Sequence, residues 1–257
     1  IVSEHSTNEM AKFAKEANEA ARNLGSTTLE FTRGALIYYQ QGLSDTEVME
    51  RTAATIKMAN TSGESAEDIS SYMTAIWNNF VDGSHTVEYY ADVISKLGAA
   101  TAATNAEIAE GMQSFAAIAD TVGLSYEYAA SALTTIVSTT RQSSSTVGNA
   151  LKTIFSRLDS VSLGETLEDG VDYTKYTKAL AQVGVEAVDV NGDLRNMNDI
   201  LDDLGNRWES LNQAQKVGLA QTVGGVRQYT NLITLLDHYD EFKDNVNLAL
   251  NSEGTLE

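Results

Sequence analysis

Residues 104–158, TNAEIAEGMQSFAAIADTVGLSYEYAASALTTIVSTTRQSSSTVGNALKTIFSRL, decide the fold because they predict three consecutive helices. Thr104 and Glu107 have the spacing of a capping box, in which a hydroxyl and a carboxylate accept the free amides at a helix start. The first helix is therefore predicted to begin at Asn105. Gly123 is expected to end it, since glycine readily adopts the left-handed conformation that closes a helix. Its apolar residues recur at helical spacing and share one face: Ile108, Met112, Phe115 and Ala119.

The second and third helices of this stretch follow from the same signals. Ser125 is predicted to cap the second helix, and residues 143–145, all serine, should separate it from the third. Burying a Leu, Ile or Phe side chain contributes roughly 1.5–3 kcal/mol, so the third helix needs neighbours to pack against. The apolar faces hold Ala129, Leu133 and Ile136 in the second helix, and Val147, Leu151, Ile154, Phe155 and Leu158 in the third.

Towards the N-terminus, the sequence predicts further amphipathic helices. Ser44 with Glu47 forms another capping box, and Ser65 with Asp68 has the same spacing. Gly98 is expected to close the last helix of this part. The predicted helices cover residues 4–24, 27–40, 44–58, 65–80 and 84–97, with a loop at 60–65.

Towards the C-terminus, the sequence is less uniformly helical. Residues 161–172 read as an acidic loop, and Asn191-Gly192 lies between β-prone residues, which predicts a small β-hairpin. Asn198 is expected to cap a helix with Trp208 on its apolar face, and Gly224-Gly225 to break the chain between two later helices. The predicted helices are 173–183, 198–211 and 212–223, followed by a last helix that carries the apolar residues Tyr229, Leu232, Ile233, Leu236 and Tyr239.

Composition supports an all-α fold. The 257 residues include no proline, which fits a chain that is nearly all helix, because proline breaks helix interiors. We therefore predict a compact multi-helix all-α domain with one small β-hairpin near 185–195. Its expected parts are an Ala-rich helical part at 1–98, a central three-helix core at 99–160, and a region of loop, hairpin and helices at 161–257.

The charge of the chain argues against two classes of partner. A formal net charge of −19 disfavours nucleic acid, whose phosphates require Lys and Arg, and also an anionic membrane surface. No apolar run approaches the roughly 18 residues that a membrane span needs. The chain has no cysteine, so it forms no disulfide. Its first residues, IVSEHSTNEM, do not resemble a signal peptide, and the chain is expected to be an internal part of a longer protein.

Motifs for catalysis, metals and cofactors are not recognisable. His5, His85 and His238 are far apart and lack metal-ligand spacing. Residues 189–193 resemble the start of a calcium loop, but Leu194 and Ile200 occupy the positions where Gly and Glu are needed. No phosphate loop occurs, and the serines at 143–145 have no neighbouring histidine to activate them. Chance carboxylate pairs are expected among 36 acidic residues. We predict no catalytic, cofactor-binding or metal-binding residues, and no enzymatic activity.

Three segments resemble the tape measure proteins of long-tailed bacteriophages and prophages. They are TTRQSSSTVGNALKTIFSRL at 139–158, GVEAVDVNGDLRNMNDILDDLGNRW at 184–208, and VGGVRQYTNLITLL at 223–236. Each motif is degenerate, but their order and spacing are hard to obtain by chance, and together they resemble the minor tail protein core region of that family. The packing or interface residues that we predict come from these segments and the apolar stripes: Phe115, Leu133, Gly148, Leu151, Ile154, Phe155, Trp208, Arg227 and Tyr229.

The resemblance implies a structural virion protein without cofactors. Such a protein is packed in the tail tube, sets tail length and leaves ahead of the DNA at infection. It implies partners among tail tip or baseplate proteins and the tail tube protein, a location in the tube lumen or tail tip, and a homo-oligomer, with a trimer as the expected form. The many glycine breaks predict a compact anchoring domain, since a literal ruler would be one long helix at about 1.5 Å per residue.

Two other functions fit the sequence. The first is a secreted or cytoplasmic helical module that oligomerises through its Ala-rich helices. The second is a fragment of a cell-wall-degrading enzyme, which would need a convergent carboxylate or histidine site in a pocket.

Overall fold

The chain is an all-α protein, as the sequence predicts. A computed structural model describes residues 7–159, 174–191 and 193–256, and these residues contain twelve helices and no strand. The helices are α1 (Thr7–Asn23), α2 (Thr28–Gln40), α3 (Asp45–Ser62), α4 (Ala66–Phe80), α5 (Val87–Ala100), α6 (Asn105–Thr121), α7 (Tyr126–Thr140), α8 (Ser144–Asp159), α9 (Thr174–Gln182), α10 (Met197–Trp208), α11 (Gln213–Asp237) and α12 (Tyr239–Leu250).

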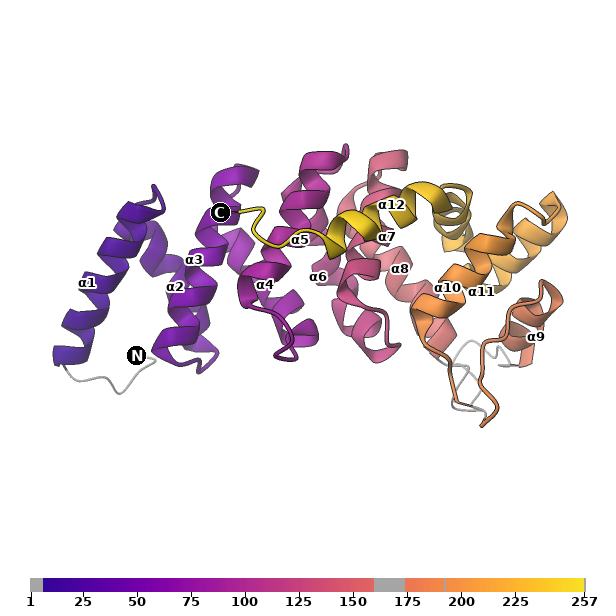
Figure 1. Ribbon diagram of the computed structural model, residues 1–257, viewed down its shortest axis with the longest axis horizontal. Coiled ribbons are helices and arrows are strands. Elements are labelled where there is room, and N and C mark those ends of the chain that lie inside the picture. The colour runs from indigo at the N-terminus through magenta and orange to yellow at the C-terminus, as the bar shows by residue number, and fades with distance from the viewer. Residues whose placement is uncertain (1–6, 160–173, 192, 257) are drawn as a thin grey trace.

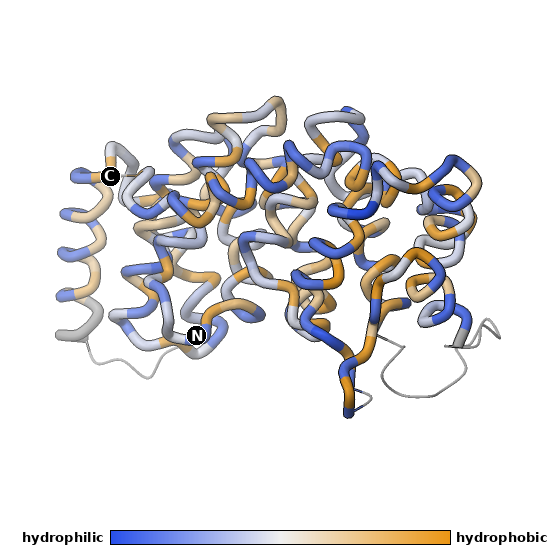
Figure 2. Tube along the Cα trace, turned by 45° about the vertical axis from the view of Figure 1, so that its right-hand side comes forward, coloured by the Kyte–Doolittle hydropathy of each residue, from blue (hydrophilic) through white to orange (hydrophobic). Residues whose placement is uncertain are grey.

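The helices form an elongated row rather than a rounded bundle. Helices α1 to α8 follow one another along the long axis in chain order, with α9, α10 and α11 at the far end (Figure 1). Helix α12 then runs back over the middle of the row, where it contacts α7 and α5. Hydrophobic and hydrophilic stretches alternate along the helices, as expected of amphipathic helices (Figure 2). One hydrophobic core runs from Ala35 to Ala249, and a smaller cluster lies under α1.

Local capping signals set where the helices begin. The capping boxes predicted at Thr104–Glu107 and Ser44–Glu47 are confirmed, so α6 begins at Asn105 and α3 at Asp45. Ser65 and Ser125 cap α4 and α7 as predicted. Two further boxes are present, Thr27 with Glu30 before α2 and Asn212 with Gln215 before α11.

The centre of the row is the close crossing of α6 and α8. Phe115 and Phe155 stack with ring centroids 6.0 Å apart. Gly111 and Gly148 allow the two backbones to approach, since a Cβ built on Gly148 would lie 2.3 Å from the Gly111 carbonyl oxygen. Leu133 on α7 fills the space beside Gly111. The apolar stripe of α8 is fully buried here: Val147, Leu151, Ile154, Phe155 and Leu158.

The predicted β-hairpin is wrong. In the described part of segment 184–196, the only pairing is an isolated antiparallel bridge between Val188 and Leu194. The turn is organised by a side chain, because Asp189 Oδ1 accepts the backbone amides of Asn191 at 2.8 Å and Asp193 at 3.0 Å. These amides are therefore bound to a carboxylate and do not extend a ladder between two strands.

Several predicted helix boundaries also need correction. Helix α3 continues through residues 60–62, where a loop was predicted, and ends at Gly63. Thr86 caps α5, and Gly98 lies inside this helix. The backbone of Gly98 approaches the start of α6, since a Cβ there would lie 3.0 Å from the Asn105 amide nitrogen. The loop predicted at 161–172 lies outside the described residues.

The C-terminal third differs most from the prediction. Asn196, not Asn198, caps α10, and the side chain of Asn198 instead accepts the amide of Ser125 at 3.1 Å. The break predicted at Gly224-Gly225 is a kink within α11, where Gly225 has φ 68° and ψ 166°. Helix α12 was not predicted.

Candidate functional site

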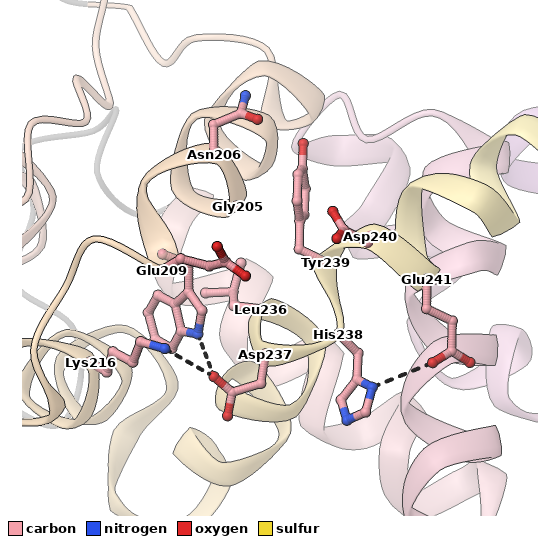
Figure 3. A pocket seen from close by; sticks show the side chains of 11 residues that line it. Gly205, Asn206, Glu209, Lys216, Leu236, Asp237, His238, Tyr239, Asp240 and Glu241 are labelled. Carbon is pink, nitrogen blue, oxygen red and sulfur yellow. Dashed lines mark hydrogen bonds and ion pairs between the residues drawn. The ribbon is translucent and has the colours of Figure 1, made fainter.

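A pocket of about 490 Å³ lies where α10, α11 and α12 meet (Figure 3). Helix α10 supplies one wall, and the other wall is the junction at which α11 ends and α12 begins. The lining residues are Gly205, Asn206, Trp208, Glu209, Lys216, Leu236, Asp237, His238, Tyr239, Asp240 and Glu241.

A one-residue junction and a glycine shape this pocket. Helix α11 ends at Asp237 and α12 begins at Tyr239, so His238, with φ −110° and ψ 35°, makes the whole turn between them. The turn places the Tyr239 ring against α10 at Gly205 (Figure 3). A Cβ on Gly205 would lie 2.1 Å from the ring, so a side chain at this position would force the ring to move.

Trp208 and Asp237 form the inner wall of the pocket. The buried Trp208 donates its indole Nε1–H to Asp237 Oδ1 at 2.6 Å. Lys216 Nζ lies 3.3 Å from the same oxygen and 5.1 Å from the centre of the indole ring. The end of α11 is thus held to α10 by one carboxylate, with an ammonium group placed over an aromatic face.

Beside the pocket, Asp202 joins α10 to α7 and α12. Its carboxylate accepts hydrogen bonds from the hydroxyls of Tyr128 at 2.8 Å and Tyr239 at 2.9 Å. Lys243 Nζ lies 3.0 and 2.9 Å from the two carboxylate oxygens. Burial, and then the hydrogen bond to Asp202, raise the pKa of Tyr239. Burial opposes the charge of Lys243, but its hydrogen bonds to Tyr128 and Asp202 raise its pKa overall.

The rim of the pocket is acidic. Glu209, Asp240 and Glu241 are exposed there, and Glu241 lies 3.4 Å from His238 Nδ1. Such a surface attracts cationic groups and repels anions. Within the described ranges, no group of three or more His, Cys, Asp or Glu side chains is arranged to hold a metal ion. No described helix is both long and apolar enough to cross a membrane.

The structure brings together six of the nine predicted packing or interface residues. All six are buried at the crossing of α6, α7 and α8: Phe115, Leu133, Gly148, Leu151, Ile154 and Phe155. Trp208 lies apart from them, at the pocket. Arg227 is exposed and Tyr229 is half-buried just after the kink in α11, where the Tyr229 backbone packs on Gly224. Their roles in binding a partner stay predictions.

Sequence reasoning missed the polar cluster around Asp202. The sequence shows Asp202 only as one of two adjacent carboxylates, and its partners Tyr128, Tyr239 and Lys243 come from two other helices. Their separation along the chain hides the cluster from any spacing rule. Two of these partners, Tyr239 and Lys243, lie on α12, which was not predicted as a separate helix.

The family described as "Phage-related minor tail protein" matches residues 15–225. This chain belongs to that family. The family's description places its members among phage tail proteins, so the all-α row is the fold of a phage tail protein.

A phage protein is also similar to this member of the minor tail protein family over nearly its whole length. The tape measure protein of Pneumococcus phage Dp-1 is 25% identical over 246 residues, which cover 94% of this chain and 19% of that protein. The chain therefore spans about a fifth of the length of this relative. No solved structure matches the chain.

Proposed function

We propose that this chain is a folded part of a tape measure protein, a structural protein of the phage virion. The observation that carries the proposal is the similarity over 94% of the chain to a protein named tape measure protein, together with the family match over residues 15–225. In this proposal the full-length protein lies in the tail tube or tail tip, sets tail length during assembly and leaves ahead of the DNA.

The fold supports an anchoring role for this part of the protein. A single helix of 257 residues would be about 385 Å long, at about 1.5 Å per residue. The chain instead folds into helices of 9 to 25 residues packed side by side. A folded row of this kind contributes little length for its mass. We therefore assign the measuring role to other parts of the protein and anchoring to this one, at the tail end, with tip or baseplate proteins and the tube protein as partners.

The charge of the chain is consistent with this role. A net charge of −19 repels the phosphates of DNA, so a protein that precedes the genome through the tube would not hold it back. The role that we propose is structural and requires no catalytic group.

Two deletions of equal length in the full-length gene test the proposal. One removes residues 7–256, and its matched control removes the same number of residues from a segment outside this chain with uninterrupted helical periodicity. The control deletion should shorten tails by up to about 1.5 Å per removed residue in electron micrographs. Deletion of residues 7–256 should instead prevent normal tails from forming.

Two results would contradict the proposal. Tails shortened equally by both deletions would mean that this region measures length and does not anchor. Absence of the protein from purified particles by mass spectrometry would exclude a virion role altogether.

A further inference from the structure

Helix α12 packs against both α7 and α5, and the surface of these two helices that it covers is here called the α5–α7 groove. Four of its residues form the buried face: Phe242, Asn245, Val246 and Ala249. The Phe242 ring packs edge-on against Tyr128 of α7, with centroids 5.5 Å apart. The opposite side of α12 is exposed, so all the packing of this helix is against the row.

Polar contacts fix the middle of α12 and the segment that follows it. Buried Asn245 donates its side-chain amide to Thr135 Oγ1 of α7 at 2.9 Å. After α12, the backbone amides of Gly254 and Leu256 each donate to the buried carboxylate of Asp92 on α5, both at 2.8 Å. These hydrogen bonds make the groove specific for this segment, because α12 does more than cover apolar surface.

The connection between α11 and α12 is one residue long and contains no helix breaker. Only His238 separates the two helices, and residues 226–250 contain neither Gly nor Pro. No side chain caps the first turn of α12. A helix start leaves backbone amides, and a helix end leaves carbonyls, without partners inside the helix. If His238 adopts helical angles, residues 226–250 become one helix of about 37 Å in which these groups pair.

We propose that α12 is exchanged between two copies of this chain. In the exchanged form α11 and α12 continue through His238 as one helix, and α12 of each copy fills the α5–α7 groove of the other. A second copy fits this groove because it carries the identical segment, so the contacts to Thr135, Asp92 and Asp202 form again between copies. The pocket at His238 is the part that opens, because both sides of the hinge line it.

A mixing experiment with two single-cysteine variants tests the exchange. The chain has no cysteine of its own, so Thr135→Cys in one copy and Asn245→Cys in a second copy of different tagged mass give an unambiguous readout. Exchange places the two thiols side by side in different chains, and mild oxidation then yields a disulfide-linked heterodimer. The double variant T135C/N245C is the positive control for pairing within one chain.

Two hinge variants outside the core keep the test independent of those substitutions. His238→Ala favours the continuous helix, and His238→Gly disfavours it about fivefold per hinge, so the dissociation constant of the dimer should differ about 25-fold between them. Light scattering measures this against the 27.7 kDa of one chain. Two outcomes overturn the proposal: both hinge variants remain single chains at every concentration, or a dimer forms without the mixed disulfide.

Discussion

Gly148 on α8 packs directly on the backbone of Gly111 on α6, where an added Cβ would lie 2.3 Å from the Gly111 carbonyl oxygen. The crossing brings Phe115 and Phe155 into contact and buries the apolar stripe of α8. The obstacle is backbone of a neighbouring helix, which cannot rotate away as a side chain can. The closest contact in the middle of the row therefore depends on the absence of a side chain at position 148.

Gly148→Ala is expected to lower the free energy of unfolding by about 1–3 kcal/mol, since overpacking a helix crossing forces the two backbones apart. Gly218→Ala is the matched control, because Gly218 is also helical but a Cβ there meets nothing within 4 Å. It should stabilise the chain by up to about 1 kcal/mol through helix propensity. Urea unfolding of both variants measures the difference, and equal effects would show that the α6–α8 contact can adjust.

The kink in α11 gives a second glycine prediction. Gly225 has φ 68° and ψ 166°, a region that essentially only glycine occupies, whereas Gly63 has φ 78° and ψ 5°, which other residues can adopt at a cost. Gly63→Ala should lower the free energy of unfolding by about 1–2 kcal/mol, and Gly225→Ala by about 3 kcal/mol. Thermal unfolding of the two variants side by side compares them, and a smaller loss at Gly225 would mean that α11 can straighten there.

The same contacts explain what could be predicted from the sequence. The starts of α3, α4, α6 and α7 follow from a capping residue and its neighbour three positions later, so they are local and were predicted correctly. The crossing at Gly148 and the cluster at Asp202 depend on helices that meet only after folding. No local rule contains that information.

The two clearest errors also have physical causes. Asn191-Gly192 is a strong hairpin signal. In the structure, however, the carboxylate of Asp189 accepts hydrogen bonds from the backbone amides of Asn191 and Asp193, so these amides are not available to pair with a second strand. Helix α12 was missed because no Gly or Pro marks its beginning, and His238 makes the turn with ordinary helix-forming residues on both sides. That absence of a breaker is also the property on which the exchange of α12 rests.

Leu151→Asp should abolish cooperative folding of the middle of the row. Leu151 is 1% exposed in the apolar stripe of α8, so the variant buries a carboxylate with no cation provided for it. Leu151→Met, which keeps the volume, should cost less than about 1.5 kcal/mol. Circular dichroism during heating distinguishes them. An unchanged melting temperature for Leu151→Asp would contradict the assignment of this residue to the core.

The Asp202 cluster should show energetic coupling between α10 and α12. Lys243 Nζ lies 2.9 Å from Asp202 Oδ2, and the side chains of Asp202 and Lys243 are 30% and 31% exposed. Solvent therefore screens part of the attraction between the two charges. In a double-mutant cycle with Asp202→Asn and Lys243→Met, the coupling is expected to be about 0.5–1 kcal/mol and to fall as salt is added. Lys216→Met is the control, since its ammonium pairs with Asp237 and not with Asp202. Coupling of Asp202 to Lys216 as strong as to Lys243 would mean that the cycle reports a general loss of charge.

Acid should weaken the start of α3 through Glu47. Hydrogen bonds from the Ser44 hydroxyl and the Ser44 amide lower the pKa of Glu47 from its ordinary value of 4.5 in the folded chain. A carboxylate with a lowered pKa stabilises the fold above that ordinary value, and this contribution is lost as the pH falls through 4.5 toward the lowered pKa. The chain should therefore lose the advantage of an ionised Glu47 only in acid.

Glu47→Gln isolates this effect, because glutamine can still accept the Ser44 amide in a capping box but does not titrate. The melting temperature of the unsubstituted chain should exceed that of the variant at pH 7, and the gap should close as the pH falls below 4.5. Glu50→Gln, an exposed carboxylate on the same helix, controls for removal of one negative charge from a chain of net charge −19. If both variants lose their difference from the unsubstituted chain in the same way, the effect is general charge repulsion, and the capping box is not its source.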